Sequence, residues 1–146
     1  MVKNSKMNKN ELAQFGEDLS TRYLEHNNYQ ILTRNYHSIY GEIDIICKKN
    51  NQVIFVEVKA RKSLKFGEPL AAITEKKKQK IIKTAYHYIS NKQIDTPLRF
   101  DVITIKYLSK ENEYQFKHIK DAFLGTPIQA PFYQNRGPNN LPNLDH

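Results

Sequence analysis

The sequence predicts an α/β fold in which helices cover both faces of a central sheet. Two amphipathic stretches with helical spacing alternate with short segments rich in β-branched and aromatic residues. In segments 42–48 and 53–61, apolar residues occupy both alternating sets of positions, as in strands buried on both faces. At 146 residues, the chain has room for one such domain and not for a second. We therefore predict a three-layer α/β/α domain over residues 10–124, with a sheet of four to five strands.

The first helix is predicted over residues 10–26. Its apolar stripe has four members at helical spacing, Leu12, Phe15, Leu19 and Tyr23. Glu17 lies on a second face, among small and apolar neighbours. Residues 1–9 carry lysines but no apolar segment, so we expect a flexible N-terminus.

Three strands are expected after this helix, then a second helix and one or two further strands. Asn50-Asn51 separates the second and third strands, and asparagine tolerates the positive φ of a tight hairpin turn. Thr74 can cap the second helix. The predicted strands are 29–36, 42–48, 53–61, 98–107 and 114–119, and the second helix runs to residue 91. Residues 125–146 concentrate Pro, Asn and Gly without periodicity, which predicts a disordered tail.

The composition favours an anionic partner and a reducing compartment. The formal charge of +8 and a pI near 9.5 suit nucleic acid, anionic lipid or an acidic protein, and they also suit lysines that only keep a protein in solution. The single cysteine, Cys47, excludes an internal disulfide and a cysteine-based zinc site. No stretch has the length of a membrane span, so we expect a cytoplasmic protein without a membrane partner.

The hairpin around Asn50-Asn51 gathers the residues with the greatest chemical interest. With the turn centred there, antiparallel register places Asp44 opposite Glu57 and Glu42 opposite Lys59, all on one face. Two facing carboxylates repel each other, and more strongly where burial removes water. A divalent cation bound by oxygen ligands would satisfy both.

The segment Glu57-Val58-Lys59 adds an amine beside the carboxylates. Residues two apart on a strand project the same way, so the Lys59 ammonium is expected a few ångströms from Glu57. It could orient or deprotonate a metal-bound water for attack on phosphorus. The plainer interpretation is a structural ion pair, because charged pairs on strands are common.

Four segments in series resemble one known family. They are FGEDL around Glu17, GEIDII (Gly41 to Ile46), FVEVKAR (Phe55 to Arg61) and RFDVI (Arg99 to Ile103). Over roughly residues 11–123 they resemble the YraN-like bacterial proteins, a family similar to Holliday-junction resolvases of the PD-(D/E)XK nuclease superfamily. The resemblance implies a restriction-endonuclease-like core with a mixed sheet, in the order helix, three strands, helix, strand.

The resemblance also implies the roles of the site residues. Mg²⁺ or Mn²⁺ would be held by Asp44, Glu57 and the backbone carbonyl of Val58, with Lys59 near the attacking water. Glu17 would match a helical glutamate that many of these nucleases place beside the metal. The alternative for Glu17 is a partly buried glutamate paired with a lysine.

Basic residues of the second helix are candidates for phosphate contacts. Lys76, Lys80 and Lys83 share one stripe, which could equally be a solvated face. Lys78 points toward the sheet and needs an anion, either a carboxylate of the site or a substrate phosphate. With Gln79 it matches a lysine-glutamine pair that recurs in the family. Further basic residues lie at or after the end of the third strand and would extend this surface around the mouth of the site. They are Arg61, Lys62 and Lys65.

Three other polar residues are expected to have structural roles. Arg99 and Asp101 lie on the fourth strand, where such pairs frequently tie strand ends. For His118, no pattern in the sequence places it near Asp44 or Glu57, so we expect it to be structural as well.

The leading functional hypothesis is a Mg²⁺- or Mn²⁺-dependent endonuclease acting on DNA, including branched or structured DNA in repair or recombination. The alternative is a nucleic-acid-binding or protein-partner module that keeps the nuclease fold without turnover. RNA stays open as a substrate, because nothing in the sequence reads a 2′-hydroxyl. The sequence also leaves open whether the protein forms a homodimer.

Overall fold

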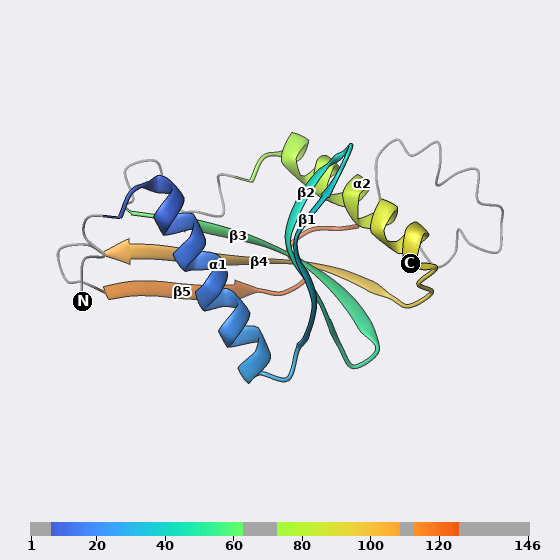
Figure 1. Cartoon of the computed structure of the whole chain (residues 1–146), viewed down its shortest axis with the longest axis horizontal. Helices are drawn as coiled ribbons and strands as arrows, with labels where there is room; N and C mark the ends of the chain where they lie inside the picture. The colour runs from blue at the N-terminus through green and yellow to red at the C-terminus, as the bar shows by residue number, and fades with distance from the viewer. Residues whose placement is uncertain (1–6, 63–72, 109–112, 126–146) are drawn as a thin grey trace.

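A five-stranded mixed sheet lies between two helices, one on each face (Figure 1). The computed structural model describes residues 7–62, 73–108 and 113–125. The helices are α1 (Lys9–His26) and α2 (Glu75–Lys92), and the strands are β1 (Gln30–Ser38), β2 (Gly41–Lys49), β3 (Gln52–Arg61), β4 (Leu98–Leu108) and β5 (Glu113–Ile119). The predicted three-layer α/β/α class is confirmed, and the predicted element ends agree within two residues.

The strands follow one another across the sheet in chain order. β3 and β4 are parallel because α2 lies between them in the chain, and the other neighbours are antiparallel. Asn50 and Asn51 have φ of 52° and 64°, which confirms the predicted hairpin turn. The turn sets the register of β2 on β3, in which Ile45 pairs with Val56.

Each face of the sheet packs against one helix. The α2 side buries Phe55 and Phe100 under the apolar stripe of the helix, and the α1 side buries a second cluster around Ile54 and Ile103. Ile43 packs with the α2 cluster, whereas Ile45 packs with the α1 cluster. The alternation of side chains along a strand predicts that residues two apart share a face. For Ile43 and Ile45 this prediction was wrong, and the break in alternation lies at Asp44, just beyond the last pair of β2 with β3.

Gly16 brings α1 close to the sheet. A Cβ added at this position would lie 3.1 Å from Ala60 Cβ and 3.3 Å from Ile105 Cδ1. A larger residue would push the helix off the strands. This close approach fixes the height of the next residue, Glu17, above β3.

Side chains cap both helices at their start. Asn8 and Glu11 form a reciprocal capping box at α1, and the Thr74 hydroxyl accepts the N–H of Lys77 at α2. Residues 7–9 thus include the cap and first residue of α1, while the rest of the predicted flexible N-terminus lies outside the described residues. The predicted tail lies outside them too, except Gly125. Neither α1 nor α2 is long and apolar enough to cross a membrane, within the part of the chain that the structure describes.

Candidate active site

Asp44 binds β3 through its side chain at the point where β2 separates from β3. Its Oδ2 accepts the backbone N–H of Val58 at 2.8 Å, two residues beyond the last residue of β3 that pairs with β2. The N–H and C=O of one strand residue point to the same neighbour. The Val58 carbonyl therefore faces the edge where the Asp44 carboxylate lies.

Glu57 is a buried carboxylate held between two lysines. Its side chain is 5% exposed, and its Oε2 lies 3.9 Å from Lys59 Nζ and 3.6 Å from Lys77 Nζ. Lys59 shares β3 with Glu57, as predicted, and Lys77 reaches over from the first turn of α2. The α2 helix therefore contributes a cation to the candidate site.

The electrostatics of the site shift two pKa values toward the neutral forms. Burial, followed by repulsion from Glu57, raises the pKa of Asp44 to about 7, although the hydrogen bond from Val58 opposes this. Burial lowers the pKa of the Lys59 ammonium, against the attraction of Glu57. Asp44 and Glu57 are thus close enough to repel each other, and both lie just beyond the last pair of β2 with β3, Ile45 with Val56.

Glu17 stands beside this pair and is tied to β1. Its Oε1 lies 3.4 Å from Arg34, which also binds Asp18 at 2.9 Å. Burial raises the pKa of Glu17, and the negative charge of Asp44 adds to the rise. The basic partner of Glu17 is therefore an arginine, where a lysine was predicted. Glu17 also lies close enough to Asp44 for the two carboxyl groups to interact electrostatically.

Among the described residues, the carboxylates of Asp44 and Glu57 form the core of the site. Within residues 7–62, 73–108 and 113–125, no three His, Cys, Asp or Glu side chains gather closely enough to hold a metal ion together. An ion at this place would take Asp44, Glu57 and the Val58 carbonyl as protein ligands. That number suits Mg²⁺, which keeps several waters and commonly binds one or two carboxylates.

Two predicted neighbours of the site have other partners. Glu42 pairs with His37 of β1, its Oε2 3.8 Å from His37 Nδ1, and its side chain is 62% exposed. The predicted facing of Glu42 and Lys59 was wrong, because β2 follows β1 after it leaves β3. Lys78 lies 3.2 Å from Glu75 of its own helix, so its anion is not a carboxylate of the site.

The remaining basic candidates lie around α2 and the end of β3. Lys76 and Lys80 are exposed, and Lys83 and Gln79 are half-buried. At the end of β3, Arg61 is half-buried and donates to the Ala60 carbonyl, and Lys62 is exposed. Lys65 lies outside the described residues.

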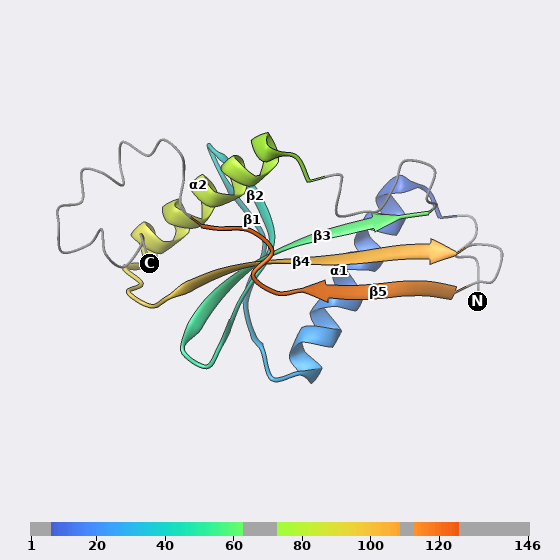
Figure 2. The same ribbon diagram turned by 180° about the vertical axis from the view of Figure 1, so that it is seen from behind.

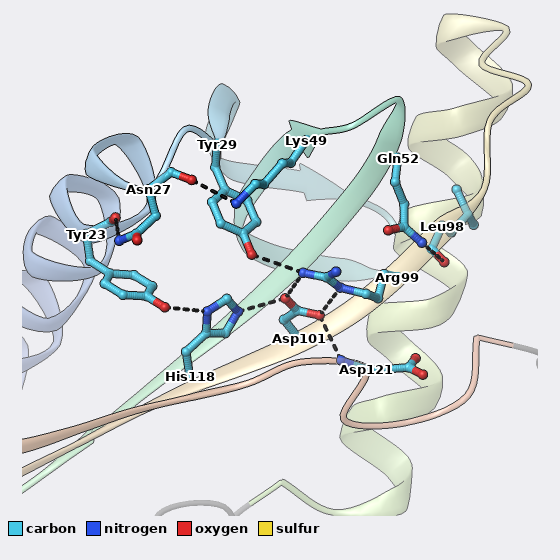
Figure 3. Close-up of polar contacts among 10 residues, drawn as sticks. All are labelled: Tyr23, Asn27, Tyr29, Lys49, Gln52, Leu98, Arg99, Asp101, His118 and Asp121. Carbon is cyan, nitrogen blue, oxygen red and sulfur yellow. Dashed lines mark hydrogen bonds and ion pairs between the residues drawn. The ribbon is translucent and has the colours of Figure 1, made fainter.

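A separate polar network is centred on Asp101 (Figure 3). Arg99 donates to both of its carboxylate oxygens, at 2.9 and 2.8 Å, which confirms the predicted ion pair. His118 Nε2 lies 2.7 Å from Asp101 Oδ2, and His118 Nδ1 lies 2.8 Å from the Tyr23 hydroxyl. Burial disfavours the charge of Asp101, but the hydrogen bonds from His118, Arg99 and the Asp121 N–H together lower its pKa. The network links β4, β5 and α1, which is a structural role.

Comparisons with known proteins place the chain in a family. A model described as uncharacterised protein family UPF0102 matches residues 16–105, a range that contains Glu17, Asp44, Glu57 and Lys59. The UPF0102 protein of Clostridium beijerinckii is 44% identical over 119 residues, which cover 81% of this chain and 96% of that protein. A UPF0102 protein of Clostridioides difficile is 44% identical over 118 residues, covering 80% of this chain and 100% of that protein. The chain therefore belongs to the uncharacterised protein family UPF0102, the YraN-like family that its motifs resemble.

Proposed function

We propose that this protein is a Mg²⁺- or Mn²⁺-dependent endonuclease of the PD-(D/E)XK superfamily that hydrolyses phosphodiester bonds in DNA. The observation that carries the proposal is the proximity of the Asp44 and Glu57 carboxylates, with the Lys59 amine 3.9 Å from Glu57. Burial and the repulsion from Glu57 raise the pKa of Asp44 to about 7, and shifts of this kind are concentrated at functional sites.

The residues present fit a divalent ion. Asp44, Glu57 and the Val58 carbonyl supply oxygen ligands, which Mg²⁺ and Mn²⁺ prefer. When bound, the ion would polarise a phosphate oxygen and lower the pKa of a water molecule. Asp44 and Glu57 would hold that ion, whose positive charge would offset the repulsion between the two carboxylates. Glu17 lies close enough to Asp44 for their charges to interact, so it would add to the negative potential around the ion.

Lys59 has the properties of a proton acceptor. Burial lowers the pKa of its ammonium, so more of its amine is neutral than for an exposed lysine at the same pH. The Nζ atom would take a proton from the attacking water. Lys77 would act differently, as a cation that orients Glu57 from α2.

The surface beside the site suits a DNA backbone. Lys76 and Lys80 are exposed on α2, the helix that also sends Lys77 to Glu57. Branched or otherwise structured DNA in repair or recombination is the substrate class that the resemblance implies. The reducing cytoplasm, which we propose as its location, suits the buried thiol of Cys47.

A cleavage assay tests the proposal. Purified protein should nick linear, branched or single-stranded DNA with Mg²⁺ or Mn²⁺, and EDTA should abolish the reaction. Glu57→Ala and Lys59→Ala should lose the activity. Glu42→Ala is the matched control, because Glu42 is an exposed carboxylate of β2 that pairs with His37. Absence of cleavage by the wild-type protein on all three substrates with both metals would overturn the proposal.

A second candidate function is a nucleic-acid-binding module without turnover. The observation that favours it is the lack of a third metal-ligating side chain beside Asp44 and Glu57 among the described residues. Such a module would bind DNA equally well in EDTA and with Asp44→Ala, and it would cleave nothing.

A further inference from the structure

The hairpin between β1 and β2 ends in two exposed apolar side chains. Ile39 is 90% exposed and Tyr40 is 41% exposed. Among the described residues two other large apolar side chains are exposed, Tyr114 on β5 and Leu124 in the segment that follows β5. The tip of the next hairpin, by contrast, is the polar pair Asn50-Asn51. Neighbouring exposed apolar residues at a projecting tip indicate a contact surface.

Contacts within the hairpin and with α2 stabilise the conformation of the tip. The Ser38 hydroxyl accepts the Tyr40 N–H at 3.0 Å and lies 3.5 Å from the Thr84 hydroxyl of α2. The Tyr40 ring meets the His87 ring at a centroid distance of 5.9 Å. Ile39 is therefore presented on a supported turn, which lowers the entropy lost when it binds something.

Lysines of α2 lie beside the tip. A Cβ added to Gly41 would lie 3.5 Å from Lys80 Cβ and 3.4 Å from Thr84 Oγ1, and both views place the hairpin beside the first half of α2 (Figures 1 and 2). Lys76 and Lys83 share the helical stripe of Lys80. The apolar tip thus has cations along one side.

The tip and the candidate site lie on the same stretch of α2. Lys77, which contacts Glu57, precedes Lys80 by about one helical turn and Thr84 by about two. At 1.5 Å per residue, the axial separation between Lys77 and Thr84 is about 10 Å. This is the span of a few nucleotides of DNA backbone, so one DNA strand could reach both places.

We propose that Ile39 and Tyr40 form a wedge that packs against an unstacked base of the DNA whose phosphates contact the α2 lysines. This inference rests on the proposed function and narrows its substrate to DNA with interrupted base stacking. In intact duplex the base faces are covered by their neighbours, and opening a step is unfavourable by a few kcal/mol. At a bubble, gap or branch point the faces are already open, so apolar and aromatic side chains can pack on them. The lysines of α2 beside the tip supply positive charge that complements the phosphates flanking such a base.

Binding measured in EDTA tests this wedge separately from catalysis. The probes are a labelled duplex with a central unpaired bubble and the same duplex fully paired, titrated with wild-type protein, Ile39→Ala and Tyr40→Ala. We expect each variant to weaken binding to the bubble by about tenfold and to change binding to the paired duplex by less than about twofold. Leu124→Ala and Tyr114→Ala are the matched controls, because they remove exposed apolar side chains of similar size elsewhere, Tyr114 being 44% exposed.

The outcomes separate the wedge from the proposed nuclease activity. Selective loss of bubble affinity in the tip variants, and not in the controls, supports the wedge even if the protein cleaves nothing. Equal loss on both probes, or no loss on either, overturns it even if the protein cleaves DNA. In the second case the tip serves another partner, such as a protein. Unchanged thermal unfolding of the variants confirms that the comparison concerns folded protein.

Discussion

The Lys77 ammonium lies 3.6 Å from the Glu57 carboxylate, although Lys77 belongs to α2 and Glu57 to β3. This contact joins the basic helix directly to the buried carboxylate of the candidate site. It makes α2 part of the charge balance around Glu57, which is 5% exposed and depends on nearby cations when no metal is bound.

Replacing Lys77 should therefore destabilise the metal-free protein. Lys77→Met leaves Lys59 as the nearest cation to Glu57, and we expect the free energy of unfolding in EDTA to fall by about 1 kcal/mol. Saturating Mg²⁺ should remove most of this deficit, because the ion would neutralise Glu57 instead. Urea unfolding with and without Mg²⁺ measures both effects.

Lys78→Met is the control for this experiment. Its partner Glu75 is 76% exposed, so the loss should stay below about 0.5 kcal/mol. If Lys77→Met unfolds at the wild-type urea concentration in EDTA, the contact with Glu57 contributes nothing to stability.

The raised pKa of Asp44 predicts a stability that decreases as the pH rises. The folded protein holds a proton on Asp44 up to about pH 7, whereas the unfolded chain releases it near its ordinary value of 3.8. Between these values the folded state binds more protons, so the free energy of unfolding falls with rising pH and stays low above about pH 7.

Asp44→Asn should remove this dependence. An amide oxygen can still accept the Val58 N–H but carries no charge. In EDTA the free energy of unfolding of the variant should exceed that of the wild type by about 4 kcal/mol at pH 8 and match it near pH 4. Denaturant melts at both pH values measure the difference. A variant that is less stable than the wild type at pH 8 would show that burial and the repulsion from Glu57 do not destabilise the charged form of Asp44.

The sequence was sufficient to predict Asp44 and Glu57 as neighbours. Two asparagines that accept positive φ fixed the turn, and the period of two along each strand then fixed the pairs, of which Ile45 with Val56 is confirmed. The argument was local, since it needed only the residues of one hairpin.

Contacts between distant elements could not be predicted in the same way. Lys77, and not Lys78, reaches Glu57 because the rotation of α2 about its axis depends on how its apolar stripe packs on the sheet. Glu42 pairs with His37 and not with Lys59, because β2 separates from β3 beyond Ile45. The sequence of β2 did not predict this separation. His118 meets Asp101 through the pairing of β5 with β4, which the sequence indicated only weakly.

Removing the Asp101 carboxylate should severely destabilise the protein. Asp101 is fully buried, and Asp101→Ala would leave the Arg99 guanidinium and His118 without their shared acceptor. We expect a loss of about 3–5 kcal/mol in the free energy of unfolding. Asp18→Ala is the matched control, since Asp18 also binds an arginine, at 2.9 Å, but is 43% exposed, and it should lose less than about 1 kcal/mol. Equal losses in urea unfolding would mean that the Asp101 network is no stronger than a surface pair.

The salt dependence of DNA binding tests whether the α2 stripe contacts phosphates. Each lysine that neutralises a phosphate of duplex DNA releases counterions and adds about 0.9 to the slope of log affinity against log salt concentration. Replacing Lys76, Lys80 and Lys83 by alanine should therefore reduce the slope by about three, provided that all three meet phosphates. The half-buried Lys83 is the least accessible of them, so a reduction near two would assign the contacts to Lys76 and Lys80.

The control is a second triple variant, in which the exposed Lys9, Lys117 and Lys120 are replaced by alanine. It removes the same three positive charges, but from α1 and the β5 region, and should leave the slope nearly unchanged. Equal slopes for both triple variants would show that net charge, and not the face of α2, attracts the DNA.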